Sequence, residues 1–506
     1  MQPHRNHSTR TSSPGLLRGL FGIALLLGLL ASTGCKVTNT DIDTWKGTRK
    51  GPGKMVAVIL ANKFEVPLRT YAALGLVEME RQDVDGVAEM QHAVAKLDGD
   101  TRDKIVEGLA DGLIALMQKA PASDKAGEGP PDYQVRAKDA AFLLVSNAQP
   151  AVRDKLTTAV VGWYTADFNG RSLAGSFSAE QVVRGLGAPA AKSLVDALSS
   201  KLPQQALIKL AELIGQLGDG PSKERAGHRL VEIEREMEGP GFLAWLEGQI
   251  GAQMKQAGAV DPAKLKKAAE LNRANFIETG ALPSMKYLAD QPEVTARLLE
   301  IASLKDPKLT DRRTHALQAL EGKVGVEQLD KLLALALDPS NPSSVRDYAF
   351  DRVGDTGSPK AIPQMWTLVQ NGEDQRLRWR AGELVLAIGG PGVLAEFFGK
   401  LPAGGVYEPE ELDGYAQRMA QMTPAPRDVA LNLLRSANWW DNIIGLDYFG
   451  RKGTLQDVAE MTALTHSGAA VKGKHWENDQ KTVGKVAEQA IAGLRERVKE
   501  AAGAGG

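Results

Sequence analysis

A motif that recurs at a fixed interval constrains this chain more than any other feature of its sequence. An arginine followed three positions later by an alanine occurs in three segments: Arg313-Thr-His-Ala316, Arg346-Asp-Tyr-Ala349 and Arg378-Trp-Arg-Ala381. The arginines lie 33 and 32 residues apart, an interval typical of one helix–turn–helix unit in repeat proteins. Residues three positions apart share one face of a helix, and the small alanine lets a second helix approach closely. The motif therefore predicts a stack of helix pairs.

The rest of the chain follows a similar helical rhythm. Between Met55 and about Glu500, segments of roughly 10–16 residues with helical apolar spacing are separated by short breaks that contain Gly, Pro, Asp or Asn. Convincing runs of alternating β-branched residues are not found. The sequence therefore predicts an all-α fold, an α-solenoid of stacked antiparallel helix pairs. A large α-domain without repeats is the structural alternative.

The Arg–Ala pattern and the Asp-Pro turns before it resemble HEAT-like repeats of bacterial type. The clear match covers roughly residues 306–402. In that family an aspartate in the turn of each unit pairs with a following arginine, and the second helices of the units line a shared surface. The resemblance implies a structural ladder of Asp306, Arg313, Asp338, Arg346 and Arg378.

The first 35 residues have the features of a bacterial export signal. Arginines precede an apolar run over residues 20–30, which is shorter than the ~20 residues of a membrane-spanning helix. The small residues Ser32, Thr33 and Gly34 and then Cys35 follow this run. They resemble the lipobox of bacterial lipoproteins, although Ser32 stands where leucine is commonest.

The lipobox resemblance implies that Cys35 is acylated and becomes the first residue of the mature protein. Cys35 is the only cysteine, so an internal disulfide and a multi-cysteine zinc site are excluded. Lys36 follows the cysteine, and in enterobacterial-type sorting a residue other than aspartate there permits transfer to the outer membrane. An ordinary signal peptide or membrane anchor with an unrelated cysteine is the alternative.

The sequence divides into segments of different character. They are a signal peptide over 1–34, a lipidated cysteine and flexible tether over 35–54, N-terminal helical repeats over 55–118, a linker loop over 119–132, irregular helical repeats over 133–305, the clearest repeats over 306–402, C-terminal repeats with a capping helix over 403–500, and a disordered tail over 501–506.

Charge and motifs exclude several classes of function. The chain has 61 basic and 62 acidic residues, so it lacks the basic excess of a nucleic-acid-binding protein. The stretch from Gly468 to His475 approaches a phosphate-binding loop, but His475 replaces the Ser or Thr that holds magnesium and no strand precedes it. We found no catalytic motif and no compact metal motif, and we expect neither a metal nor a cofactor. Whether the protein is an enzyme stays open, with a binding role favoured.

Six residues are candidates for contact with a partner. They are Arg376, Arg378, Trp379, Arg380, Trp439 and Trp440. Arginine suits bidentate recognition of carboxylate or phosphate, and exposed tryptophan is enriched at interface hot spots. The alternatives are that the arginines pair within the structural ladder and that the tryptophans fill the last layer between helices.

Together these features predict a lipid-anchored solenoid that binds one or more proteins at the bacterial envelope. Two alternatives remain. One is a ligand-binding protein or enzyme with a pocket formed by the glycine-rich region over 162–187, and the other is a structural envelope component.

Overall fold

The structure, a computed structural model, describes residues 36–79, 83–119, 133–166, 175–256, 258, 261–371 and 374–503. They form two compact units, one ending at Val182 and the other beginning at Val183. The described residues contain helices and no β-strand, apart from an isolated bridge between Ala470 and Thr482, so the all-α prediction is confirmed. The predicted signal peptide, the lipobox with Cys35, and nearly all of the predicted linker lie outside the described residues.

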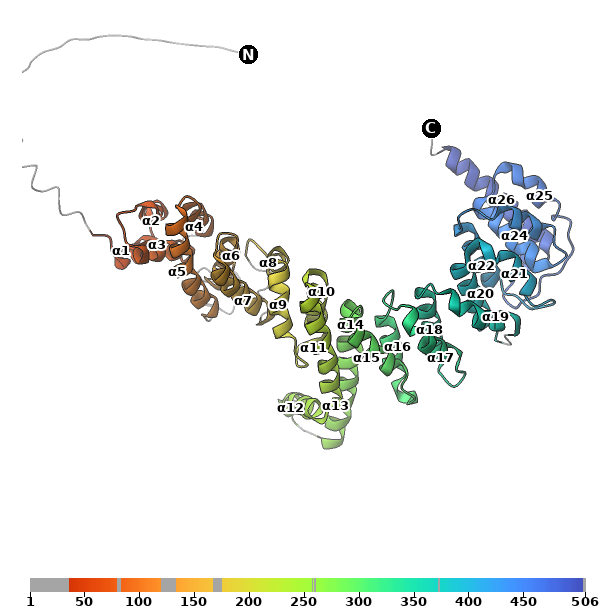
Figure 1. The fold of residues 1–506 in the computed structure, drawn as a ribbon, viewed down its shortest axis with the longest axis horizontal. Coiled ribbons are helices and arrows are strands. Elements are labelled where there is room, and N and C mark those ends of the chain that lie inside the picture. The colour runs from red at the N-terminus through yellow and green to blue at the C-terminus, as the bar shows by residue number, and fades with distance from the viewer. Residues whose placement is uncertain are drawn as a thin grey trace, which may run out of the picture. The chain divides into compact units, whose positions relative to one another are not determined.

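In the first unit successive helices pack side by side (Figure 1). They are α1 (Asn39–Lys46), α2 (Gly51–Leu60), α3 (Val66–Val77), α4 (Gly86–Ala95), α5 (Gly99–Gln118), α6 (Tyr133–Val145) and α7 (Pro150–Ala166), and α8 (Ala179–Leu186) crosses the boundary between the units.

The second unit is also a stack of helices, with short 3-10 turns between several of them. Its helices are α9 (Ala188–Ala197), α10 (Gln204–Leu217), α11 (Gly220–Glu238), α12 (Pro240–Gln256), α13 (Pro262–Phe276), α14 (Leu282–Met285), α15 (Pro292–Ala302), α16 (Thr310–Ala319), α17 (Leu329–Leu337), α18 (Ser343–Asp355), α19 (Ile362–Asn371), α20 (Gln375–Gly389), α21 (Leu394–Lys400), α22 (Pro409–Gln421), α23 (Arg427–Leu434), α24 (Trp439–Lys452), α25 (Val458–Thr462) and α26 (Val483–Gly503).

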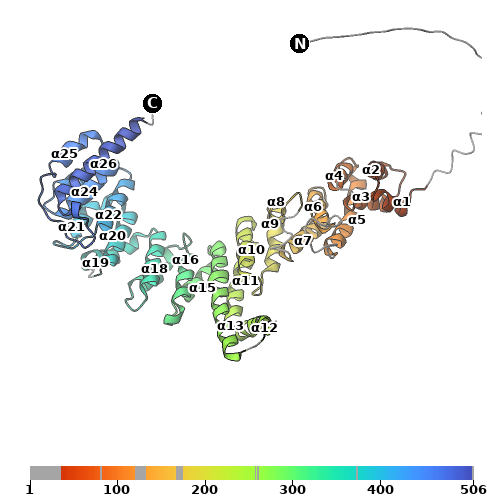
Figure 2. The same cartoon turned by 180° about the vertical axis from the view of Figure 1, so that it is seen from behind.

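Two stretches depart from simple helix pairing. Helices α12 and α13 form a hairpin that extends away from the neighbouring helices in both views (Figures 1 and 2), and a π-helical turn over Ile277–Ala281 joins α13 to α14. Among the described residues, the stretch Gln375–Lys400 is long and apolar enough to span a membrane. It consists of α20 and α21, which are separated at Gly390, where φ is +59°, and it packs within the array.

Two of the three repeated arginines, and Arg69 in the N-terminal unit, bind backbone carbonyl groups at the end of the preceding helix. Their Nε atoms donate from Arg313 to Ala302 O at 2.9 Å, from Arg346 to Ala336 O at 3.1 Å and, in the N-terminal unit, from Arg69 to Ile59 O at 2.7 Å. The last carbonyls of a helix have no partner within it and carry partial negative charge, so a guanidinium stabilises them.

This geometry corrects the partners that the resemblance implied for the ladder. Asp306 accepts a hydrogen bond from the backbone amide two residues later and begins a 3-10 turn. Asp338 likewise caps its turn and pairs with Lys305 at 2.9 Å, and these contacts lower the pKa of Asp338. Arg313 instead donates to Asn341 Oδ1 at 2.6 Å. Asp306 and Asp338 thus shape the turns, and Arg313 and Arg346 bind helix ends.

The predicted flexible tether over 35–54 and the predicted tail also differ from the structure. Helix α1 occupies much of the tether because Ile42 is completely buried and packs near Gly75 of α3. Thr38 and Asp41 form a capping box that starts this helix. At the other end, α26 extends to Gly503, three residues into the predicted tail.

Helices α20 and α22 approach each other through two glycines that receive aromatic rings. A Cβ atom on Gly382 would lie 2.6 Å from Tyr415 Oη, and one on Gly414 would lie 2.8 Å from Trp379 Nε1. Tyr415 is completely buried, and its hydroxyl donates to Glu411 at 3.0 Å. The ring is therefore held in place and cannot make room for a larger residue.

We expect Gly382→Ala to lower the free energy of unfolding by about 1–3 kcal/mol, because the new methyl group overpacks this contact. Gly493→Ala is the matched control, since Gly493 is helical and nothing lies near its Cβ position; it should raise stability by up to about 1 kcal/mol. Urea denaturation measures both. Equal effects of the two substitutions would contradict the close approach.

Candidate binding surface

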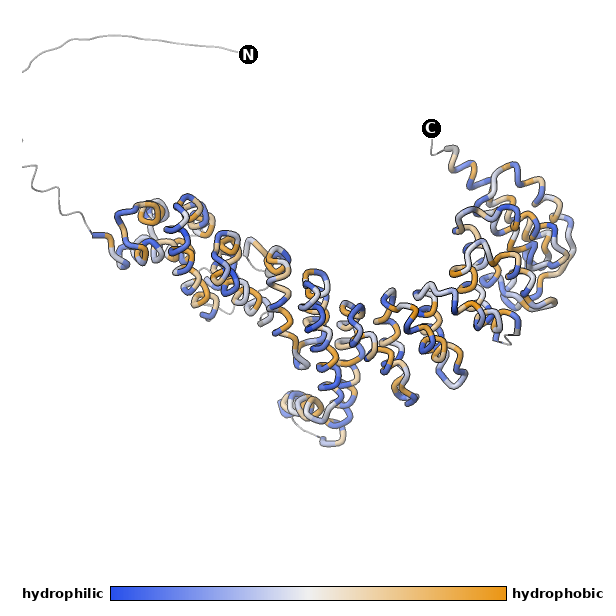
Figure 3. The backbone as a smooth tube through the Cα atoms, in the orientation of Figure 1, coloured by the Kyte–Doolittle hydropathy of each residue, from blue (hydrophilic) through white to orange (hydrophobic). Residues whose placement is uncertain are grey.

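The second helices of consecutive repeat units form a continuous row. We call α16, α18, α20, α22 and α24 the second-helix row. Each member contacts the next, and α16, α18 and α20 also pack on the first helices α15, α17 and α19 (Figure 1). Hydrophobic and hydrophilic residues alternate along these helices (Figure 3), as expected when one side is buried and the other is open.

The register of the repeat places different residues on the two sides of this row. Counted from the repeated arginine, the third residue is a fully buried alanine in all three units. The second residue lies two positions after the arginine, and the fifth lies two positions after the alanine. Each is therefore rotated by about 200° around the helix axis from that arginine or alanine. These residues are all half-buried: His315, Tyr348 and Arg380 at the second position, and Gln318, Asp351 and Glu383 at the fifth. They define what we call the open face of the row.

Two of the predicted binding arginines lie on this row and are paired with acidic side chains of α18. Arg380 donates to Asp351 at 2.6 Å, and Arg376 pairs with Asp347. Burial raises the pKa of Asp347, and the two arginines oppose that shift. These two predicted binding arginines are therefore members of charge pairs between neighbouring helices.

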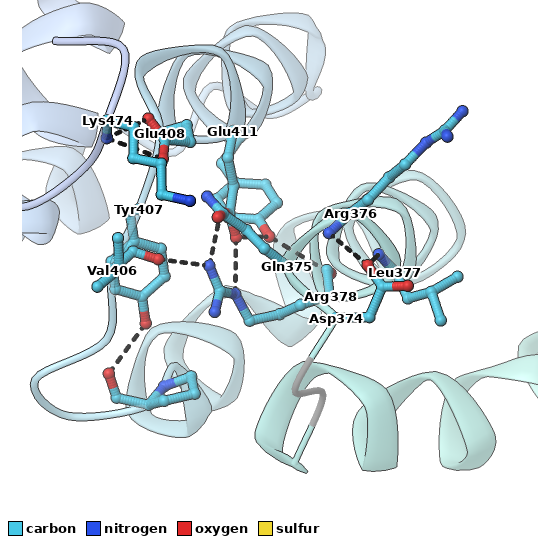
Figure 4. A network of polar contacts seen from close by, with 12 residues as sticks. Asp374, Gln375, Arg376, Leu377, Arg378, Val406, Tyr407, Glu408, Glu411 and Lys474 are labelled. Atoms are coloured by element: carbon cyan, nitrogen blue, oxygen red, sulfur yellow. Dashed lines mark hydrogen bonds and ion pairs between the residues drawn. The ribbon is translucent and has the colours of Figure 1, made fainter.

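Arg378 is buried and does not belong to the open face. Its guanidinium donates to Glu411 at 2.9 and 2.7 Å and to Val406 O at 2.8 Å, and it stacks on the Tyr407 ring (Figure 4). Glu411 is completely buried, whereas Arg376 points away from this network (Figure 4). Arg378 thus forms an ion pair within the core and is unavailable to a partner, as the structural alternative stated.

Burial also makes the two tryptophans that were predicted to anchor a partner unavailable for binding. Trp439 and Trp440 are 7% and 4% exposed. Trp439 lies 6.1 Å from Trp476 between ring centroids, and Trp440 lies 5.4 Å from Tyr407. Neighbouring residues of a helix point about 100° apart, but α24 is covered by α22, α23, α26 and these two rings, so both indoles are buried. They fill a layer between helices, and Trp379 is half-buried against α22.

The open face contains a groove that was not predicted from the sequence. It has a volume of about 430 Å³, and its lining includes Pro283, His315, Gln318, Ala319 and Tyr348. The available signal was the register of the repeat, because the second and fifth residues after each arginine share one face of their helix.

An acidic side chain with a raised pKa lies between α22 and α24. Burial and the nearby Asp413 carboxylate raise the pKa of Asp447 to about 7, against the opposing effect of Arg451. Arg451 forms an ion pair with Asp413. Asp447 therefore changes its charge near neutral pH.

A second cavity, of about 570 Å³, lies in the first unit. Arg136, Asp139, Gly175, Ser176 and Phe177 contribute to its lining, and Ser176 N donates to Asp139 at 2.8 Å. It includes Gly175, Ser176 and Phe177 from the middle of the glycine-rich region over 162–187, where a pocket was one of the alternatives.

The stretch that resembles a phosphate-binding loop binds a carboxylate of the chain itself. The amides of Lys474 and His475 donate to Glu408 at 3.0 and 2.9 Å. Over the residues that the structure describes, no group of three or more His, Cys, Asp or Glu side chains is placed to hold a metal ion.

Removing one partner of the buried ion pair should be costly. We expect Glu411→Ala to destabilise the protein by about 3–5 kcal/mol, because it leaves the Arg378 charge buried without its partner. Arg376→Met, two residues away on an exposed side chain, should cost at most about 1 kcal/mol. Thermal unfolding compares the two. Similar losses of stability in the two variants would contradict the assignment of Arg378 and Glu411 as a buried ion pair.

The Asp447 carboxyl should make stability depend on pH. Its pKa is higher in the folded chain than in the unfolded chain, so its contribution is fully present below about pH 4 and is lost as the pH rises to about 7. Asp447→Asn should therefore remove a fall in unfolding free energy across this window. Urea titrations of both proteins at several pH values measure it, and parallel pH profiles would contradict the assignment.

No family model matches the sequence, and no curated protein matches it. Among solved structures, the chain is similar to Kap121p, with 12% identity, a TM-score of 0.32 and coverage of 90% of this chain and 54% of the other. It is also similar to importin beta (11%, TM-score 0.26, 88% and 68%) and to Uso1-2 (12%, TM-score 0.27, 88% and 85%). The chain spans about half the length of the Kap121p chain that it matches. Because these identities and TM-scores are low, the description of the fold rests on the helix packing within this chain.

Proposed function

We propose that this protein is a scaffold or assembly factor that binds other proteins through the open face of the second-helix row, and that a lipid on Cys35 holds it at the bacterial envelope, at the outer membrane. One observation carries the binding role. The buried residues that pack one helix on the next lie on one side of the second helices, and the half-buried polar residues and the groove lie on the other. Such a face can vary in sequence without loss of the fold.

The anchor is supported by the lipobox resemblance at Cys35 and by the position of α1. Only residues 36–38 separate Cys35 from this helix. Four residues span at most about 14 Å when extended. An acylated Cys35 would therefore keep the folded N-terminal unit next to the bilayer, closer than a flexible tether over 35–54 would allow.

A second candidate function, binding of a small molecule, is favoured by the cavity in the first unit. Its volume of about 570 Å³ lies within the ~300–1,000 Å³ of ligand pockets. Arg136 gives it a positive charge, while Asp139 is already paired with Lys138 at 2.9 Å, and this suits a polar or anionic ligand.

Site-directed photo-crosslinking in intact cells tests the binding face. We expect a crosslinking residue in place of Glu383, on the open face, to give discrete adducts with one or a few proteins. The same residue in place of Gln364, which is exposed on the first helix α19, should give none. Equal adduct patterns at both positions, or none at Glu383, would refute the open face as the binding surface.

Replacement of the lipid acceptor tests the anchor separately. We expect Cys35→Ser to abolish incorporation of labelled fatty acid and to move the protein out of the membrane fraction. Replacement of the neighbouring Lys36 by Ala should leave acylation unchanged. Continued acylation of the Cys35→Ser protein would show that the lipobox resemblance is misleading.

A further inference from the structure

The groove on the open face has a regular origin in the repeat. Pro283, Lys286 and Glu321 contribute to its lining, and the other lining residues are the second, fifth and sixth residues after the repeated arginine in two successive units: His315, Gln318 and Ala319 on α16, and Tyr348, Asp351 and Arg352 on α18. The groove is therefore the gap between the open faces of two neighbouring second helices.

A comparison with the next unit explains why this gap is open. Between α18 and α20, Arg380 at the second position reaches back to Asp351 at the fifth position of the preceding helix and bonds to it at 2.6 Å. The equivalent residues between α16 and α18 are Tyr348 and Gln318, which cannot form an ion pair. Neither side chain has a hydrogen-bond partner within the described chain. The groove lies where the ion pair of the neighbouring unit is missing.

The charges around the groove are already neutralised. Three ion pairs surround it: Lys286 with Glu321 at 2.9 Å, Arg352 with Asp355 at 3.0 Å, and Arg380 with Asp351 at 2.6 Å. A charged ligand would have to compete with these pairs or remain unpaired. The groove therefore favours an uncharged occupant.

The groups that remain free suit a peptide backbone. The Tyr348 hydroxyl and the Gln318 amide are neutral donors and acceptors, and His315 uses only Nδ1, which lies 2.8 Å from Asp311 O. Ala319 lies beneath them as a small apolar floor. Packed helices lie about 8–10 Å apart, and an extended chain advances about 3.3 Å per residue, so a segment that crosses from α16 to α18 meets the next helix after about three residues.

We propose that this groove binds an extended, uncharged segment of a protein partner, with its backbone on Gln318 and Tyr348 and one apolar side chain over Ala319. The proposal rests on the proposed function of the open face and names the chemistry that one part of it recognises.

The neighbouring unit supplies the variant that tests this proposal. Gln318→Asp combined with Tyr348→Arg copies the ion pair of α18 and α20 into the groove and should close it while the fold is kept. The probe is a phage-displayed library of random 12-residue peptides, selected on the full chain. We expect enriched peptides to be uncharged with an apolar residue, and to bind the double variant at least tenfold more weakly.

Two controls make the result decisive. Gln364→Asp, on the exposed side of α19, should leave peptide binding unchanged. If circular dichroism shows that the double variant is unfolded, Gln318→Trp, which fills the groove from a half-buried position, takes its place with the same expected loss. No enriched peptides, a charged consensus, or unchanged binding to the closed groove would overturn the proposal.

The crosslinking at Glu383 separates this proposal from the proposed function. Adducts at Glu383 together with a failed peptide selection would support the open face as a binding surface and would reject the groove as a peptide-binding site. Absence of both would refute the two proposals together.

Discussion

The bond between an arginine side chain and the last carbonyl groups of the preceding helix organises the repeats at Arg313 and Arg346, whereas Arg378 in the third repeat binds Glu411 instead. The same device occurs outside the three motifs, as Arg153 on Val145 O and Arg497 on Gly450 O. The final carbonyls of each helix have no partner within it, and a hydrogen bond to a charged group contributes about 1.5–3 kcal/mol. The arginine also fixes how the second helix of a unit lies against the end of the first.

This arrangement separates stability from recognition. The arginine and the alanine three residues later are on the side that packs, together with contacts such as Tyr415 on Gly382. The second and fifth residues after the arginine are left for the open face. Where these residues have opposite charges, as Arg380 and Asp351 do, they tie neighbouring helices together. Where they are neutral, as Tyr348 and Gln318 are, a groove remains.

The sequence predicted the helices and their repeat well because both follow from local periodicity. It predicted less well what each side chain binds. Asp338 and Arg346 have opposite charges at a suitable spacing, but a carbonyl at a helix end competes for the guanidinium, and no local pattern reveals this. Trp439 and Trp440 could be placed only when distant segments around Tyr407 and Trp476 were known to cover α24. Predicting the groove would have required both the register of the repeat and the knowledge of which side of the second helices is open.

Hydrogen exchange of single variants tests most directly whether the two sides of the second helices have separate roles. We expect Arg346→Met to accelerate amide exchange at the end of α17 and the start of α18 by about tenfold or more, because the carbonyl at Ala336 loses its partner. Tyr348→Ala, two residues away on the open face, should leave exchange in both helices nearly unchanged. Similar acceleration in both variants would show that the open face holds the fold together and would contradict the separation.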